Sequence, residues 1–360
     1  MTHGKGWTWS ARRGGAGRGR SFTARVATAI GAAALAAVTL LSVQGCAPAP
    51  DADADTPVSH SVTFADARAA YQTYLKVSDA AAAQDNETSA LSVVAAAQWV
   101  QTKSQYAALA TAGTPVPRYR YGTPVFYLPA ISGYPQWFVA AVNRTTVTGG
   151  KPGAKDSTLM LFAQENKTEG WTLSGTAVLS RPLPAIARDA GGYAIAVPTT
   201  DSALLLRPDV VGATHAAVVD DGPVSPAAAV VAAGPQTTGL HTAQTARAAA
   251  ERARGLEYQW LLQGTPWPQV GLRLADGGAL VLYGMYLNTS TEHPHLVEGT
   301  PIPVPAAFTP LLAEPTEVGY HAVSANWAYQ FGAIDPPASA RDGKLDIIAS
   351  QNGPSFGRAY

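Results

Sequence analysis

The densest set of potential metal ligands lies in one short segment, Glu292-His293-Pro294-His295, with Glu298 close by. Imidazole and carboxylate groups are both ligands for zinc. The two histidines flank a proline in an expected loop, so their rings can diverge, and the spacing supplies no third or fourth ligand. We therefore assign no metal site. Zinc capture through His293 and His295 is kept as an alternative that calorimetry can test.

No complete catalytic signature is found in the chain. A Ser-x-x-Lys pair, which would place a hydroxyl beside an activating base, does not occur. Gly-x-Ser-x-Gly occurs once, at 353–357, where we expect no helix to follow, so it lacks the strand-to-helix turn of a nucleophile elbow. The His-Glu-x-x-His motif and the phosphate-binding Gly-x-x-x-x-Gly-Lys motif are also absent. His215, His241 and His321 are isolated in sequence, and such histidines are more often surface or core groups than general bases. We assign no catalytic and no cofactor-binding residue.

Two further patterns have both a structural and a functional interpretation. Arg118-Tyr119-Arg120-Tyr121 could form a basic and aromatic binding face. On a half-buried strand, the tyrosines would face inward and the arginines toward solvent without any ligand, and we favour that interpretation. Asp220-Asp221 could pair two carboxylates, but we expect a loop before Gly222-Pro223. A final set of aromatic residues could line a concave sheet, although core packing is favoured: Tyr127, Tyr134, Trp137 and Trp171.

The only cysteine, Cys46, has a context typical of lipid attachment. The first 25 residues carry six basic groups and no acidic one, and the stretch 26–43 that follows is uncharged, as in a signal peptide. Val43 and Gly45 before the cysteine resemble a lipobox, while Gln44 is less usual there. A cysteine that merely follows an ordinary cleavage site is the alternative. We predict a lipoprotein signal peptide at 1–45 and a lipid on Cys46.

Composition restricts where the protein acts and what it binds. Removing residues 1–45 changes the balance from 25 basic and 25 acidic residues to 19 and 25. This mildly acidic chain lacks the excess of Lys and Arg that drives nucleic-acid binding. Residues 46–62, rich in Ala, Pro and Asp, are expected to form a disordered tether. We expect a protein anchored to the outer, extracytoplasmic face of the cell membrane.

After the tether, helices precede strands in each half of the chain. Thr63 with Asp66 predicts a capped helix to about Gln84, and a second helix is expected over 91–109. Short apolar runs separated by turn residues then predict strands at 118–121, 125–128, 137–142, 159–162 and 171–179. The second half repeats this order, with a helix over 242–254 and strands at 256–262, 270–274, 279–287, 318–331 and 345–349. The fold class is α+β.

This element order resembles a pair of NTF2-like, cone-shaped domains, which we place at 63–200 and 201–352. The chain over 60–350 is also similar to a family of uncharacterised two-part lipoproteins from high-GC Gram-positive bacteria. The residues that carry this resemblance are 126–129 with 134–138, 272–281, and Asp335-Pro336-Pro337. The resemblance implies an exported, lipid-anchored domain, and it implies no reaction, cofactor or functional residue.

We therefore predict a non-enzymatic, lipid-anchored envelope protein whose domains bind a partner protein or a small ligand. The alternative is an enzyme or small-ligand binder that uses a pocket inside one of the cones. Fold analogy alone supports this alternative.

Overall fold

Helix α1 (Phe64–Ala83) starts at the predicted capping box in the computed structural model, which describes residues 62–294, 300–312 and 318–360. The Asp66 amide donates to the Thr63 hydroxyl, and the Thr63 amide donates to the Asp66 carboxylate at 2.9 Å. These bonds satisfy two amides that lack a partner within the helix. The predicted signal peptide (1–45), Cys46 and the tether up to residue 61 lie outside the described residues.

The second helix, expected over 91–109, is present but starts later than predicted, and a short separate helix precedes it. Helix α2 (Glu87–Leu91) and helix α3 (Ala96–Ala112) are separated by four residues. In that gap, the Ala95 amide donates to the Leu173 carbonyl and the Leu173 amide donates to the Val93 carbonyl, both at 3.0 Å. The backbone therefore pairs with a strand far along the chain, which the periodicity of the helix does not reveal.

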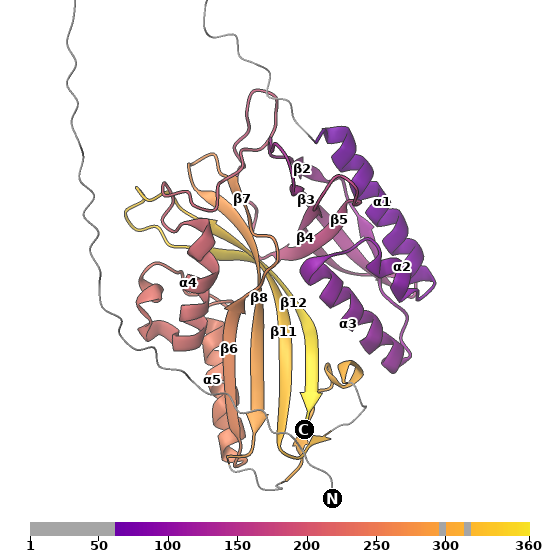
Figure 1. The fold of residues 1–360 in the computed structure, drawn as a ribbon, viewed down its shortest axis with the longest axis vertical. Coiled ribbons are helices and arrows are strands. Elements are labelled where there is room, and N and C mark those ends of the chain that lie inside the picture. The colour runs from indigo at the N-terminus through magenta and orange to yellow at the C-terminus, as the bar shows by residue number, and fades with distance from the viewer. Residues whose placement is uncertain (1–61, 295–299, 313–317) are drawn as a thin grey trace, which may run out of the picture. The chain divides into compact units, whose positions relative to one another are not determined.

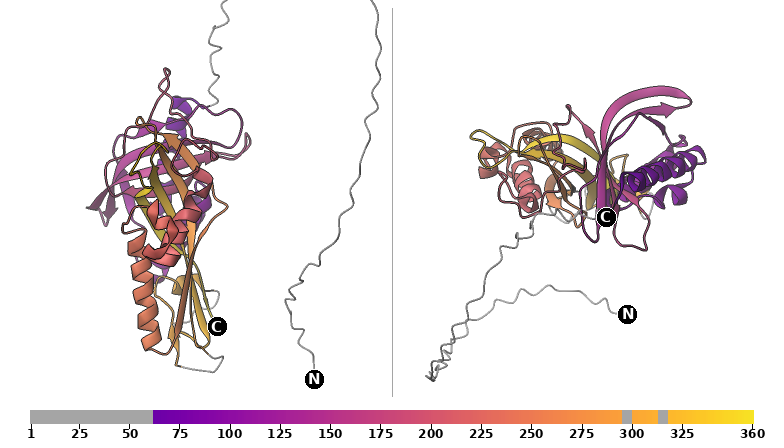
Figure 2. Two further views of the ribbon diagram at one scale, coloured as in Figure 1. Left: turned by 90° about the vertical axis from the view of Figure 1, so that its left-hand side faces the viewer. Right: turned by 90° about the horizontal axis from the view of Figure 1, so that it is seen from above.

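The five strands predicted in the first half are all present. They are β1 (Arg118–Tyr121), β2 (Val125–Tyr127), β3 (Gln136–Thr148), β4 (Lys151–Gln164) and β5 (Thr172–Leu179). Strands β3 and β4 are longer than expected because their polar ends continue into a hairpin that turns at Gly149-Gly150, where both glycines have positive φ. Seen from above, the strands of this hairpin curve around the helices on their side of the sheet (Figure 2).

The second half contains one helix that the sequence did not suggest. Helix α4 (Pro208–Asp221) precedes helix α5 (Thr238–Ala253), and it buries Val211, Val218 and Val219 completely. Asp220 and Asp221 end this helix, so their predicted loop placement is wrong. The strands that follow are β6 (Glu257–Gly264), β7 (Val270–Arg273), β8 (Ala279–Glu292), β11 (Ala322–Asp335) and β12 (Asp346–Ala359). The minor elements are β9 (Ile302–Pro303), β10 (Val318–Gly319) and 3-10 turns at Gly222–Val224, Pro226–Ala229 and Thr309–Leu311.

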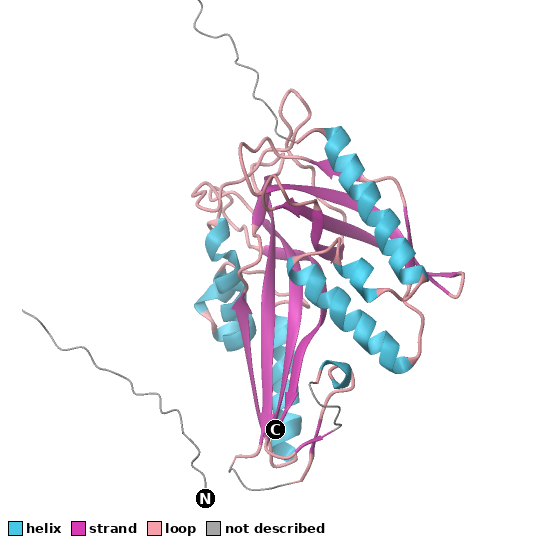
Figure 3. Ribbon diagram, turned by 45° about the vertical axis from the view of Figure 1, so that its right-hand side comes forward, coloured by secondary structure: helices cyan, strands magenta, loops and turns pink. Residues whose placement is uncertain are grey.

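One antiparallel sheet of ten strands joins the two halves (Figure 1). Its main path runs β1-β3-β4-β5-β12-β11-β8-β6, and the junction is a short pairing of Leu179 and Val178 with Ala349 and Ser350. The helices form two groups, with α3 against β5 and β12 and with α4 and α5 against β6 (Figure 3). The predicted α+β class is confirmed. The division into two NTF2-like domains stays a prediction.

The segment at 181–207, which contains the boundary that we placed between residues 200 and 201, is built into the core. Ala196 and Ile186 pair with Leu272 and Leu274, which lie in and next to β7. Ile186 is buried in a cluster that also includes Leu159 from β4 and Leu280 from β8. The cluster therefore contains residues from both halves of the chain and from the segment between them.

Candidate functional site

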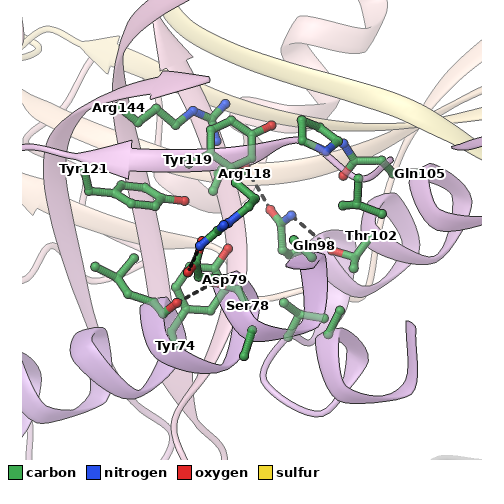
Figure 4. A pocket seen from close by; sticks show the side chains of 18 of the residues that line it. Tyr74, Ser78, Asp79, Gln98, Thr102, Gln105, Arg118, Tyr119, Tyr121 and Arg144 are labelled. Atoms are coloured by element: carbon green, nitrogen blue, oxygen red, sulfur yellow. Dashed lines mark hydrogen bonds and ion pairs between the residues drawn. The ribbon is translucent and has the colours of Figure 1, made fainter. Parts of the chain in front are cut away.

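A cavity of about 650 Å³ lies between helices α1 and α3 and strand β1 (Figure 4). This volume is in the range of about 300–1,000 Å³ that is typical of small-molecule pockets. Small side chains face it from the helices, namely Ser78, Ala82 and Ala90. They leave space where larger residues would complete the core. Single residues of three other strands complete the wall: Arg144 of β3, Thr176 of β5 and Gln351 of β12.

Arg144 brings a buried positive charge to this cavity. The residue is only 9% exposed, and its guanidinium carbon lies 4.8 Å from the centre of the Tyr119 ring. One terminal nitrogen, Nη2, donates to Gln351 Oε1 at 3.2 Å, while Nε is buried without a hydrogen-bond partner. No described carboxylate forms an ion pair with Arg144. A buried guanidinium without an ion pair and with an unpartnered N–H group destabilises the folded protein unless an anion binds beside it.

Polar side chains next to Arg144 form a connected network. The Thr176 hydroxyl lies 2.9 Å from Gln98 Oε1 and 3.0 Å from Gln351 Oε1. The Gln351 amide nitrogen donates to Gln101 Oε1 at 3.3 Å. The network therefore links α3, β5 and β12 and restrains the side chains that surround the guanidinium.

Strand β1 forms one rim of the cavity, and its alternation is as predicted. Tyr119 and Tyr121 are half-buried, whereas Arg118 and Arg120 are exposed, and all four residues contribute to the wall. Arg118 forms a bidentate ion pair with Asp79 of α1, with Nε 2.7 Å from Oδ1. The hydrogen bond from Arg118 holds the pKa of the Asp79 carboxyl below its usual range. Asp79 is therefore already paired and stays ionised at neutral pH.

Three tyrosine hydroxyls of the wall stay protonated at neutral pH. Burial raises the pKa of Tyr106 to about 12. Burial also raises the pKa values of Tyr74 and Tyr121. A protonated phenol can donate a hydrogen bond, so these groups can face a ligand acceptor but cannot supply a negative charge.

Beneath α4, the second half of the sheet is covered by closely packed, buried side chains. His215 of α4 is fully buried there, with Nδ1 3.0 Å from the Tyr283 hydroxyl and Nε2 donating to the Gln236 carbonyl at 2.7 Å. Its ring packs against Phe331, with the ring centres 4.7 Å apart. Burial lowers the pKa of His215 to about 4. His215 is therefore a neutral, hydrogen-bonded core residue.

None of the other described histidines lines the cavity. His241 donates from Nδ1 to the Val219 carbonyl at 2.9 Å, and His293 donates from Nε2 to the Thr300 carbonyl at 2.9 Å. His295 and Glu298, the other members of the expected cluster, lie outside the described residues. Within the described part of the chain, no three His, Cys, Asp or Glu side chains gather as a metal site would require. Zinc capture through His293 and His295 stays an untested alternative.

None of the four aromatic residues that could have lined a concave sheet contributes to the cavity wall. Trp171 packs on Phe138, with ring centres 5.1 Å apart, and Tyr127 and Trp137 pack against the core shared by both halves. Tyr134 is 44% exposed. The aromatic groups of the cavity come instead from α1, α3 and β1.

Sequence reasoning missed the interior of the cavity. Arg144 had a readable signal, because it continues the inward-facing series Phe138, Ala140 and Val142 along β3. An arginine at an inward-facing position of a buried strand is unusual. Gln351 had no such signal, because its place in the wall depends on the pairing of β12 with β5.

Comparison with known proteins places this fold in a family. A family model described as a domain of unknown function (DUF8094) matches residues 58–352. The chain belongs to this family. No solved structure matches it.

Two curated proteins that are similar to this chain come from Streptomyces. An uncharacterized lipoprotein of Streptomyces avermitilis is 31% identical over 164 residues, which is 44% of each chain. An uncharacterized lipoprotein of Streptomyces coelicolor is 23% identical over 239 residues, which is 65% of each chain. The chain thus spans less than two thirds of the length of these relatives. The expected resemblance to uncharacterised lipoproteins is confirmed.

No helix in the described ranges is both long and apolar enough to span a membrane.

Proposed function

We propose that this protein is a lipid-anchored envelope protein that holds a small ligand in the cavity between α1, α3 and β1. The anchor is Cys46, and its support is the lipobox-like context together with the relatives that are named lipoproteins. Two acyl chains attach a protein lastingly to a membrane, whereas one gives only marginal binding. Cleavage before Cys46 would leave the chain on the extracytoplasmic face of the cell membrane.

The cavity is the observation that carries the proposal. Its volume of about 650 Å³ is kept open by small residues on the helices, and its polar groups are held in place by one another. Preorganised polar groups in a concave, partly apolar site are the usual arrangement of a ligand pocket. The closely packed residues beneath α4 in the second half contrast with this cavity, and the contrast supports a role for the cavity.

An enzyme stays an alternative hypothesis. The one carboxylate among the described wall residues, Asp79, pairs with Arg118 at the exposed rim, and no described wall residue is a histidine. The wall therefore offers tyrosine hydroxyls, amides and guanidinium groups. These groups are suited to holding a ligand by hydrogen bonds and charge.

Uptake of a neutral apolar dye tests the cavity. We expect the chain from residue 46 onward, carrying Cys46→Ser, to bind N-phenylnaphthylamine with a saturable rise in fluorescence. Thr102 of α3 is 8% exposed and faces the cavity, so Thr102→Phe should fill part of it and weaken dye binding about tenfold.

Thr111→Phe is the matched control, because Thr111 is an exposed residue of the same helix outside the cavity wall. It should leave dye affinity unchanged. Equal affinities for both variants and the parent chain would refute the ligand-binding proposal.

Metabolic labelling with an alkyne analogue of palmitate tests the anchor. The wild-type protein should incorporate the label and partition with membranes, whereas Cys46→Ser should do neither. Equal labelling of the two proteins would refute lipidation at Cys46.

A further inference from the structure

We infer that the ligand of this cavity is a small amphipathic molecule with a single carboxylate, and that Arg144 binds the carboxylate. This inference rests on the proposed function and adds the chemical class of the ligand. Its basis is the charge of the cavity wall, the state of Arg144 and the distribution of apolar side chains in the wall.

The charge around Arg144 is not balanced by the protein. Asp156 of β4 is the cross-strand neighbour of Arg144, yet the two form no ion pair. Asp79 is engaged by Arg118 through two hydrogen bonds. The other charged groups of the described wall are cations at exposed positions, Lys76 and Arg120. An incoming anion would therefore meet a positive wall.

The guanidinium of Arg144 has donors available for such an anion. Only Nη2 makes a hydrogen bond among the described residues, and Nε is buried without a partner. The residue is 9% exposed, and its guanidinium carbon lies over the Tyr119 ring, 4.8 Å from the ring centre (Figure 4). A planar guanidinium presents paired N–H groups that match the two oxygens of a carboxylate.

A single negative charge fits this site better than a phosphate. One buried guanidinium balances one carboxylate, whereas a phosphate monoester carries about −1.5 to −2 at neutral pH and favours clusters of arginines. The remaining cations of the wall are exposed or already paired, so they would neutralise a second buried charge poorly.

The wall also has an apolar part, which would contact an apolar group of the ligand. Leu75, Val94, Tyr106 and Val116 line the cavity on the helical side. Apolar surface that is removed from water there contributes about 25 cal/mol per Å². A ligand with a carboxylate at one end and an apolar group at the other matches both parts of the cavity.

Dansyl-aminohexanoic acid, its methyl ester and the matching dansylated alkyl phosphate are suitable probes. They share one apolar body and differ in the charge of the end group. The chain from residue 46 onward, with Cys46→Ser, should bind the acid at least about tenfold more tightly than the ester and the phosphate. Arg144→Met retains an apolar side chain against Tyr119 and removes the charge, so it should reduce the affinity for the acid to that for the ester.

Unchanged ester binding by Arg144→Met would show that the variant keeps its fold and its cavity. Arg68→Met makes the same chemical change at an exposed position of α1 outside the wall, and it should leave all three affinities unchanged.

Equal wild-type affinities for acid and ester would overturn the carboxylate assignment, and phosphate binding as tight as acid binding would do the same. If the protein still takes up N-phenylnaphthylamine in either case, the ligand-binding proposal survives. Failure to bind both the dye and every dansyl probe would overturn both ideas.

Discussion

Asp335 makes the stability of this protein depend on pH, in a direction opposite to that of most carboxylates. Asp335 ends strand β11 and is fully buried. Its Oδ1 accepts a hydrogen bond from the Leu206 amide at 3.3 Å, while Oδ2 is buried without a partner. Burial raises the pKa of this carboxyl from its ordinary value of 3.8 to about 7, and the nearby Asp201 charge adds to the effect. The folded protein therefore holds a proton at a pH where the unfolded chain has lost it.

The sign and size of the effect follow from proton linkage. Between pH 4 and pH 7 the folded state binds more protons at this site, so the free energy of unfolding falls as the pH rises. The pKa of Asp335 is about 7 in the folded protein and 3.8 in the unfolded chain. Because each pKa unit corresponds to about 1.36 kcal/mol, the free energy of unfolding is lower by about 4 kcal/mol above pH 7. Asp335→Asn keeps the acceptor for Leu206 and cannot ionise. The variant should match the wild type near pH 4 and exceed its stability by about 4 kcal/mol at pH 8.

The assay is urea unfolding of both proteins at intervals from pH 4 to pH 8. His215 also titrates over this range, because burial lowers its pKa to about 4 and makes stability rise with pH between about 4 and 6.5. Its contribution is the same in both proteins, so it cancels in the difference between them. Asp342→Asn, which replaces an exposed side chain, is the control for loss of a carboxylate. A difference between wild type and Asp335→Asn that stays constant over pH 4–8 would refute the reasoning.

Three further substitutions test packing and capping by the same unfolding measurement. In Gly175→Ala, the new methyl group would overlap the buried Gln330 amide, so we expect the free energy of unfolding to fall by about 1–3 kcal/mol. The control Gly170→Ala, whose methyl group has no neighbour within 4 Å, should be close to neutral. Equal effects of the two substitutions would contradict this expectation. Phe162→Ala removes a fully buried ring that stacks on Phe138 at 4.8 Å, and it should cost about 3–5 kcal/mol; a loss below about 1 kcal/mol would show that the stack is not part of the core. Thr63→Ala removes the cap of α1 and should cost about 0.5–2 kcal/mol, and an unchanged urea midpoint would show that the capping box adds nothing.

Local signals were sufficient for most elements of the fold. The capping box at Thr63 and the alternation of β1 both correspond to what the residues predicted. Each depends on interactions within a few residues of chain. Helix α4 was not predicted, although Pro208 stands in its first turn, because Val210, Val211 and Gly212 are poor helix formers. Tertiary packing overrides their low helix propensity.

The cavity depends on contacts that local signals cannot encode. Gln101 and Gln351 are hydrogen-bonded although they are 250 residues apart. Gln98 and Thr176 meet only because α3 packs across β5. Polar residues such as these look like ordinary surface positions in the sequence, and only the pairing of β12 with β5 brings them to one site.

The asymmetry between the two halves explains why the cavity lies where it does. In the second half, Val211, His215 and Val218 of α4 are buried against large residues such as Tyr283 and Phe331, so helix and sheet interlock. In the first half, α1 presents alanine and serine toward a strand that carries arginine and tyrosine, and the space between them stays open. The last strand, β12, is held on one side by β11 of the second half and contacts β5 on the other, so the second half positions Gln351 beside Arg144. The proposed binding site in one half therefore depends on the packed core of the other.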